Sequence, residues 1–179
     1  KRPTHKNTSW DRARFEVCAH KWADLSEPGY GVALMNDCKY GYDVHEGVMG
    51  LTLIKSGIFP NPDADQGQHE FTYALFPHQG DFRKGGVVRE AYDLNCPMAW
   101  EKVQGIYKDS FSMLQIAEEN VMADTVKAAE DGNGIIVRLY ETWGMRTKVH
   151  VNFPLAPDAQ VTACDCMENF SGAENADMS

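Results

Sequence analysis

The sequence predicts an all-β protein built as an antiparallel β-sandwich. Short apolar or alternating runs recur at regular spacing, turn sequences separate them, and hardly any segment keeps a helical period. The last third is clearest, because Glu130-Asp131-Gly132-Asn133-Gly134 is typical of a hairpin turn that needs positive φ. The strands expected in this part are 111–118, 121–129, 135–140 and 147–153.

Residues 30–56 are predicted to form the hairpin around which the chain is organised. The apolar run 31–35 leads into a polar and aromatic stretch, 36–43, which we call the crest, and the run 48–54 returns. The crest combines carboxylate, carboxamide, ammonium and phenol groups, a mixture suited to hydrogen-bonding a polyhydroxylated ligand. An ordinary loop is the alternative, since Asn, Asp and Gly dominate turns for conformational reasons.

The segments on either side of this hairpin are less regular. Residues 15–25 fit either a helix or a strand, and 57–68 contain two prolines and an acidic cluster that exclude regular structure. The remaining expectations are a strand at 69–77, a loop at 78–86, a short ambiguous segment at 87–92 and a connection at 95–110.

Composition excludes several classes of function. Hydrophobic residues make up 43% and charged residues 24%, as in an ordinary globular protein, and the net charge of −9 argues against nucleic acid or an anionic membrane as partner. No run of residues is long and apolar enough to span a membrane. The chain opens on Lys1-Arg2-Pro3 without an initiator Met and closes in a polar tail, 171–179, so we expect it to be a piece of a longer protein.

The chain has 5 cysteines, an odd number in a chain too large to need disulfides. Reduced thiols in a cytoplasmic protein are the simpler interpretation. Cys164 and Cys166 form a C-x-C pair that could ligate a metal, but no second pair or suitably spaced His accompanies it. Two small buried side chains on one strand face are therefore expected.

The candidate binding or catalytic side chains are acidic residues scattered along the sequence. The cluster formed by Asp63, Asp65, His69 and Glu70 is too compact for an EF-hand, and an acidic turn contacting sugar hydroxyls is favoured over a metal site. A glycosidase needs two carboxylates, which Asp37, Asp43, Asp65 and Glu70 could supply, but ordinary solvated acids are the default. No nucleophile elbow, metal-binding histidine spacing or phosphate loop occurs. The residues by themselves indicate a β-rich carbohydrate-contacting or accessory domain.

Four segments of the sequence, taken in order, resemble those of a known family. They are RPTHKNTSWDRARFEVCAHKWADLSEPGYGVALMNDCKYGYD, DADQGQHEFTYALFPHQGDFR, VREAYDLN and AEDGNGIIVRLYETWG. Together they resemble the C-terminal β-region of α-mannosidases of glycoside hydrolase family 38, in the bacterial and cytosolic or vacuolar branch. The resemblance runs from Arg2 to Gly144 and weakens beyond, leaving 164–179 unassigned.

The resemblance implies retaining hydrolysis of α-mannosides through a covalent mannosyl-enzyme intermediate, with a divalent metal, usually zinc. In that family the metal ligands and catalytic carboxylates belong to an N-terminal region that has no counterpart in this sequence. We therefore expect no catalytic residue, metal ligand or cofactor within this chain, which should be inactive alone. Residues 1–105 resemble part of a galactose-mutarotase-like supersandwich, 110–170 resemble a small terminal β-sandwich, and 171–179 form the tail.

The resemblance also assigns a role to the crest. In family members a loop of the C-terminal β-region contributes to the wall of the mannose pocket. The substrate-binding residues expected here are Asn36, Asp37, Lys39, Tyr40 and Gly41, with Asp65 and His69 as neighbours. The expected partners are an α-mannoside and the catalytic domain of the same chain. Unpaired sheet edges are expected to favour self-association or pairing with the missing part of the chain. Two alternatives are a crest that only docks the β-region on the catalytic domain, and a free-standing carbohydrate-binding or scaffold module.

Overall fold

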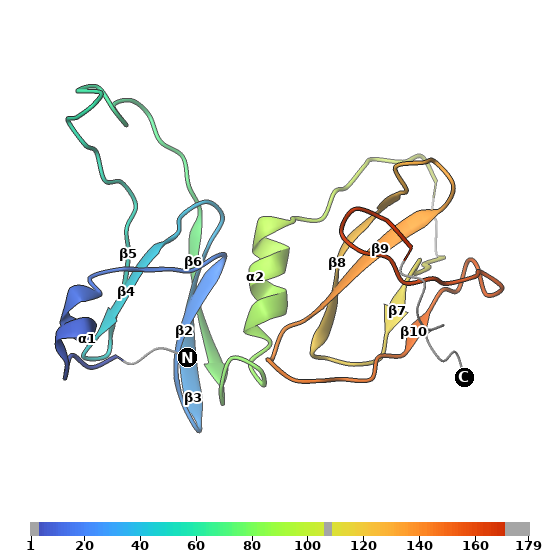
Figure 1. Cartoon of the computed structure of the whole chain (residues 1–179), viewed down its shortest axis with the longest axis horizontal. Helices are drawn as coiled ribbons and strands as arrows, with labels where there is room; N and C mark the ends of the chain where they lie inside the picture. The colour runs from blue at the N-terminus through green and yellow to red at the C-terminus, as the bar shows by residue number, and fades with distance from the viewer. Residues whose placement is uncertain (1–3, 106–108, 171–179) are drawn as a thin grey trace. The chain divides into compact units, whose positions relative to one another are not determined.

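The computed structural model describes residues 4–105 and 109–170 (Figure 1). Residues 1–3 and 171–179 lie outside the described residues, so the expectations for the chain start and for the polar tail are not addressed by it. The chain divides into two compact units, Lys1–Lys102 and Val103–Ser179. All strand pairs in the described ranges are antiparallel, which confirms the predicted fold class. The assignment of 1–105 and 110–170 to two particular sandwich types stays a prediction.

The first unit contains two helices and six strands in its described part: α1 (Ser9–Ala13), β1 (Val17–Cys18), β2 (Trp22–Glu27), β3 (Tyr30–Asn36), β4 (Gly41–His45), β5 (Val48–Leu51), β6 (Tyr73–Gln79) and α2 (Val87–Asn95). They form two three-stranded sheets, in the orders β2-β3-β6 and β1-β4-β5. The strand expected at 69–77 therefore begins later, at Tyr73, and extends two residues further.

The predicted central hairpin is wrong. β3 pairs with β2 and β6, whereas the returning run pairs with β4, so the two apolar runs lie in different sheets. The turn that reverses the chain is Glu46-Gly47, where both residues have positive φ, 52° and 80°. The crest is thus a crossing between two sheets, and its last residues already belong to β4. The sequence pattern showed both runs but could not show which strand each run pairs with.

Helix α2 covers one face of the β2-β3-β6 sheet and was missed as an ambiguous segment. Val87 and Ala91 are fully buried and pack with Ala33 and Met35 of β3. The apolar spacing i, i+4 places both side chains on one face of the helix. The chain enters the helix through Gly86 at φ 68°, a conformation that glycine adopts without strain. The pattern was too short to identify a helix by periodicity alone.

A buried hydrogen bond between His78 and Asp24 crosses the same sheet. The His78 Nε2 atom lies 2.8 Å from Asp24 Oδ1, and both side chains are almost fully buried. The imidazole fits tightly between two glycines: a Cβ at Gly31 would lie 2.4 Å from His78 Cε1, and one at Gly85 would lie 2.4 Å from His78 Nδ1. A Cβ at Gly31 would also lie 2.7 Å from the Ser26 Cβ, so these positions favour glycine.

The N-terminal segment is more ordered than its mixed composition indicated. Thr8 caps α1 through a reciprocal capping box with Asp11. Residues 15–25 form strands β1 and β2, so the strand alternative is correct there and the helix alternative is wrong.

The second unit contains four strands in its described part: β7 (Gln115–Ile116), β8 (Val121–Ala128), β9 (Ile135–Glu141) and β10 (Val151–Asn152). β8 and β9 pair across the Glu130–Gly134 turn, which confirms the predicted hairpin. The runs 111–118 and 147–153 were expected to be full strands, but only two residues of each pair with one another. Apolar alternation alone does not make a ladder where no neighbouring strand continues it.

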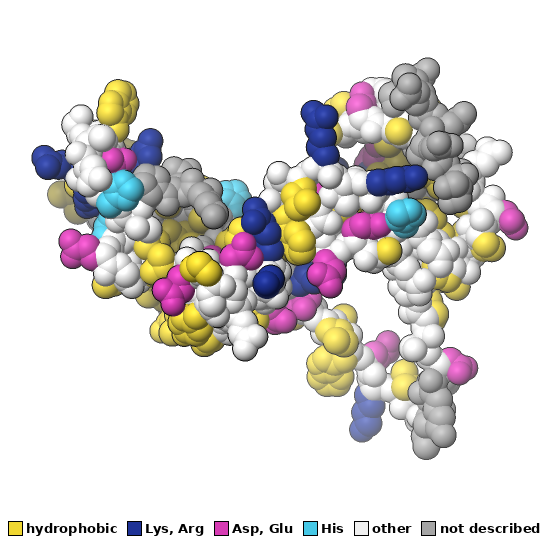
Figure 2. Space-filling model, turned by 90° about the horizontal axis from the view of Figure 1, so that it is seen from below, with side chains coloured by type: hydrophobic (Ala, Val, Ile, Leu, Met, Phe, Trp, Pro, Cys, Tyr) yellow, Lys and Arg dark blue, Asp and Glu magenta, His cyan; other side chains and the backbone are white. Residues whose placement is uncertain are grey.

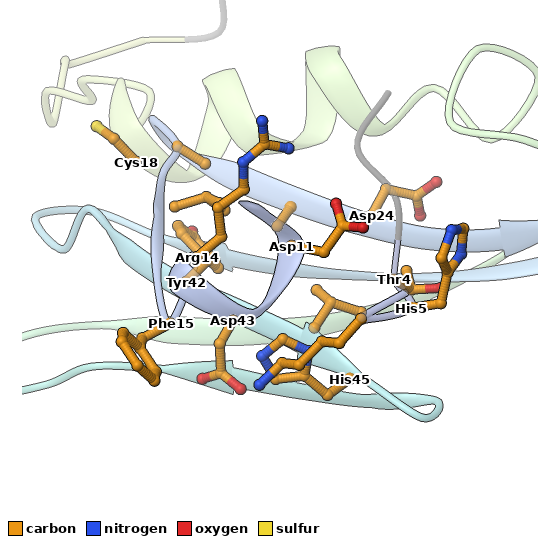
Figure 3. A pocket seen from close by; sticks show the side chains of 15 residues that line it. Thr4, His5, Asp11, Arg14, Phe15, Cys18, Asp24, Tyr42, Asp43 and His45 are labelled. Carbon is orange, nitrogen blue, oxygen red and sulfur yellow. The ribbon is translucent and has the colours of Figure 1, made fainter. Parts of the chain in front are cut away.

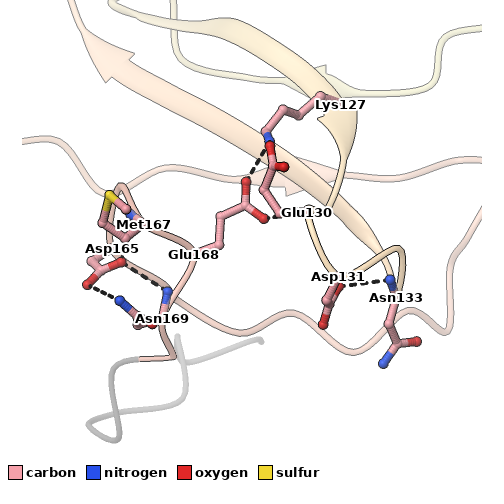
Figure 4. A network of polar contacts seen from close by, with 8 residues as sticks. All are labelled: Lys127, Glu130, Asp131, Asn133, Asp165, Met167, Glu168 and Asn169. Atoms are coloured by element: carbon pink, nitrogen blue, oxygen red, sulfur yellow. Dashed lines mark hydrogen bonds and ion pairs between the residues drawn. The ribbon is translucent and has the colours of Figure 1, made fainter.

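A polar network ties the C-terminal loop to this hairpin (Figure 4). Lys127 Nζ lies 2.6 Å from carboxylate oxygens of both Glu130 and Glu168. The Glu130 N–H donates to Glu168 Oε2 at 2.8 Å. In the same loop Cys164 is half-buried and Cys166 is exposed, so the expected pair of buried thiols is wrong. In the described part of this segment, strand pairing is limited to an isolated β-bridge between Cys164 and Phe170. One bridge does not place the side chains of Cys164 and Cys166 together on a buried face.

One face of the molecule carries a mixed distribution of side chains. Figure 2 shows acidic and basic side chains interspersed with exposed apolar ones on the face in view. Within the described ranges, no helix has the length and apolar character to cross a bilayer.

The core position Val87 provides a direct test of the packing of α2. Val87→Ala should lower the free energy of unfolding of the first unit by about 2 kcal/mol, because it removes buried methyl groups and leaves a cavity. Val48→Ala is the matched control, since Val48 is mostly exposed. Urea denaturation followed by circular dichroism measures both, and equal effects of the two substitutions would contradict the placement of α2.

Candidate functional site

Asn36 is the hub of the crest. Its side chain is 1% exposed, its Nδ2 donates to the Tyr42 hydroxyl, and its Oδ1 accepts the backbone N–H of Cys38 at 3.0 Å and that of Lys39. Asn95 Nδ2 of α2 donates to the Asn36 carbonyl at 3.0 Å. These bonds use the polar atoms of Asn36 within the protein. The structure therefore places this predicted substrate-binding residue beneath the crest, where it shapes the backbone.

Tyr42 joins the two sheets at this point. It is almost fully buried in β4, and its hydroxyl lies 3.5 Å from the Leu34 carbonyl of β3. Burial raises the pKa of Tyr42, while the bond from Asn36 opposes this shift. The phenol therefore stays neutral over the ordinary pH range, so its hydroxyl can both donate and accept.

Asp37 fastens the crest to the segment that enters β6. Asp37 N donates to the Thr72 carbonyl at 3.2 Å, and Thr72 N donates to Asp37 Oδ1 at 3.0 Å. The Cys38 thiol and the Thr72 N–H, in that order, hold the pKa of Asp37 below its usual value. The side chain is exposed, and one of its carboxylate oxygens is engaged by Thr72. The carboxylate is thus ionised and fixed at the surface.

Lys39, Tyr40 and Gly41 complete the predicted crest residues. Lys39 Nζ lies 4.9 Å from the centre of the Phe71 ring. The ring of Tyr40 meets the imidazole of His20 edge-on at 5.1 Å, and the Tyr40 side chain remains 56% exposed. Gly41 is the first residue of β4, and a Cβ there would lie 3.2 Å from Glu16 and Thr52. The Lys39 ammonium and the Tyr40 ring thus each lie against an aromatic ring, and Tyr40 remains largely exposed.

Asp65 and His69 come together in the long loop before β6. His69 Nε2 lies 2.7 Å from the Asp65 carbonyl oxygen, and both side chains are exposed. This loop reaches away from the two sheets (Figure 1). Over the described ranges, no hydrogen bond, ion pair or ring contact joins either residue to the crest, so the structure groups these two with each other and not with residues 36–41.

A cavity that the sequence did not reveal lies beside the crest. It measures about 210 Å³ and is lined by residues of the N-terminal segment and by β4 (Figure 3). Asp43 and His45 of β4 and Arg14 of the N-terminal segment border it, and His45 Nδ1 is buried with no hydrogen-bond partner in the described structure. Folding brings together segments about 30 residues apart here, and no local motif signals this meeting. The sequence pointed to Asp43 only as one of four carboxylates that could supply a glycosidase pair.

The described residues do not fit a metal centre. No group of three or more His, Cys, Asp or Glu side chains gathers at metal-binding positions in 4–105 or 109–170. Within the described part of the chain, neither the C-x-C pair nor the acidic loop belongs to such a group.

Comparison with known proteins identifies the family. Residues 1–63 match the model described as "Glycosyl hydrolases family 38 C-terminal domain", and residues 120–178 match "Glycosyl hydrolases family 38 C-terminal beta sandwich domain". The chain belongs to the C-terminal region of glycoside hydrolase family 38. The predicted resemblance is thereby confirmed, but its expected weakening beyond Gly144 is wrong, because the second match continues to residue 178.

Relatives of this family 38 region are named as α-mannosidases. Alpha-mannosidase 2C1 from Homo sapiens is 44% identical over 171 residues, covering 93% of this chain and 16% of the human protein. An alpha-mannosidase from Saccharomyces cerevisiae is 38% identical, covering 87% of this chain and 16% of the yeast protein. The chain thus spans about a sixth of the length of these relatives.

A solved structure shares the fold. The crystal structure of an alpha-mannosidase from Enterococcus faecalis V583 aligns with a TM-score of 0.76 at 20% identity, over 95% of this chain and 20% of that one.

The structural role of Asn36 can be tested by removing its side-chain amide. Asn36→Ala should lower the free energy of unfolding by about 1–3 kcal/mol, because the N–H groups of Cys38 and Lys39 and the Tyr42 hydroxyl lose a partner. Asn61→Ala, in the exposed loop, is the control and should cost much less. Urea denaturation measures both, and a negligible effect of Asn36→Ala would contradict its structural role.

The acid titration of Asp37 gives a second test. The folded pKa of Asp37 lies below its unfolded value of about 3.9, so its bond to Thr72 adds stability above that value and loses it as the pH falls through the folded pKa. The Thr72 amide proton resonance should therefore titrate with a midpoint below about 3.9 in NMR spectra. The shift should be absent in Asp37→Asn. A midpoint at or above the unfolded value would contradict the proposed anchoring.

Proposed function

We propose that this chain is the C-terminal, pocket-completing region of a retaining α-mannosidase, with the crest forming part of the wall that surrounds the mannoside. The relatives named as α-mannosidases support the activity of the whole protein. The observation that carries the role of this region is the construction of the crest, a polar surface loop anchored from below by Asn36 and Tyr42.

The crest residues divide into two groups by burial. Asn36 is internally satisfied and acts as a positioning residue. Asp37 and Tyr40 are exposed, and Lys39 is held over the Phe71 ring, so carboxylate, phenol and ammonium groups point from a fixed backbone. Fixed short polar groups lose little conformational entropy on binding, so they suit recognition of sugar hydroxyls.

The catalytic chemistry of the proposed enzyme is supplied by polypeptide outside this chain. In such an enzyme zinc would polarise and orient the substrate, and two carboxylates would act as nucleophile and as acid/base. In the described residues no three or more His, Cys, Asp or Glu side chains gather as a metal site, so the role proposed for them is to bind and orient the substrate.

The proposed compartment is the cytoplasm. The cysteines all occur as free thiols, and four of the five are exposed. Exposed free thiols persist where the surroundings keep them reduced.

The substrate role predicts a kinetic effect in the full-length protein. Asp37→Ala, Lys39→Ala and Tyr40→Ala should each lower kcat/KM for a chromogenic α-mannoside by roughly tenfold, because each removes a contact to the sugar. Tyr30→Ala is the matched control for Tyr40→Ala, since Tyr30 lies at the start of β3 and is 52% exposed. Asp93→Ala and Lys55→Ala are exposed controls for the two charged positions.

Unchanged kinetics in all three crest variants would contradict the substrate role and leave the crest as a docking surface. The isolated chain should neither turn over the substrate nor bind mannose. Turnover by the isolated chain would contradict the placement of catalysis elsewhere, and mannose binding would favour a free-standing carbohydrate-binding module.

A further inference from the structure

Strand β6 lies at the edge of its sheet and has unusual side chains for an edge strand. Its sequence, YALFPHQ, carries no Lys, Arg, Asp or Glu. Proteins normally protect a free sheet edge with charges, bulges or a covering segment. In the described residues β6 pairs with β3 alone, so one of its edges is free.

Burial across the β2-β3-β6 sheet shows where its covering layer stops. Leu34 of β3 lies opposite Ala23 of β2 on one side and Leu75 of β6 on the other. Leu34 is 7% exposed, whereas its neighbour Leu75 is 67% exposed. The next pair repeats the pattern, because Asn36 is 1% and Tyr73 is 58% exposed.

The layer that covers this face is the sheet containing β4. Tyr42 of β4 contacts Leu34 and Asn36, which explains the burial of the face over β3. The opposite face of β6 is also occupied, since Ala74 and Phe76 pack toward the core beneath α2. Only the Tyr73 and Leu75 side of β6 is both apolar and uncovered.

The free backbone groups lie at the same residues. Asp37 N donates to the Thr72 carbonyl, so the Thr72 backbone faces β3. Backbone direction alternates along a strand, so Ala74 and Phe76 also face β3, while Tyr73 and Leu75 present N–H and C=O to the free edge. Pro77 faces outward as well and lacks an N–H, so it limits pairing to the first half of β6.

We propose that a β-strand from the part of the same polypeptide outside these 179 residues pairs with β6 at Tyr73 and Leu75 and covers their side chains. The length of chain available supports this occupant, since the region spans only 16% of the human and yeast relatives. An apolar, uncharged edge suits a permanent strand partner better than a transient one. This interface is distinct from the proposed substrate role of the crest.

Site-specific cross-linking in the full-length protein tests the proposal. Leu75→p-benzoylphenylalanine should cross-link, on irradiation, to a peptide from outside this chain, identified by mass spectrometry. The same substitution at Phe82, which stacks on Trp22 at 5.2 Å, is the positive control and should cross-link within the first unit. A cross-link to residues 103–170, a cross-linked dimer, or no product at position 75 would each overturn the proposal.

Hydrogen exchange of the full-length protein provides an independent readout that does not depend on activity. The Leu75 amide should be protected to within about tenfold of the Phe76 amide, which faces β3. Leu75→Asp should speed exchange at Tyr73 at least roughly tenfold, whereas Leu75→Met, which keeps the apolar contact, should not. Rapid exchange at Leu75 beside a protected Phe76 would mean that the edge is free in the whole protein and would overturn the proposal.

Discussion

The contact between Asn36 and Tyr42 is the constraint on which the first unit depends. Asn36 ends β3 and Tyr42 lies in β4, so this pair of side chains connects two sheets that share no ladder in the described residues. The same amide accepts the N–H groups of the intervening loop. Because both side chains are buried, loss of either leaves polar groups with no water to replace the partner. Fold stability and loop shape are therefore coupled at this site.

This coupling explains why the crest can present polar groups without being a flexible turn. Its backbone is held from below by Asn36, and its start is fastened to the β6 segment through Asp37 and Thr72. The rings of Phe71 and His20 then support Lys39 and Tyr40. The role proposed for the crest in a mannoside pocket would require such rigidity, since a sugar that had to order the loop would bind with lower affinity.

Local features of the fold were predictable where the signal lies within a few residues, as in the Glu130–Gly134 turn. The pairing of β3 was not, because the sequence shows apolar runs but not their partners, and Thr72 meets Asp37 from 35 residues away. Asn36 was singled out as part of the crest, but from the sequence its amide could equally face a ligand or the core. Only the burial of the folded chain distinguishes these roles. The cavity beside β4 had no local signal at all.

The imidazole of His78 occupies space that side chains at Gly31 and Gly85 would otherwise take. The ring is not the only obstacle, because a Cβ at Gly31 would also lie 2.7 Å from the Ser26 Cβ, and a Cβ at Gly85 would lie 2.8 Å from the His78 Cβ. A smaller residue at 78 would therefore open no room for alanine at either glycine, and it would give up the bond to Asp24. Evolutionary change at positions 31, 78 and 85 is thus restricted by the backbone itself and not by the histidine ring alone.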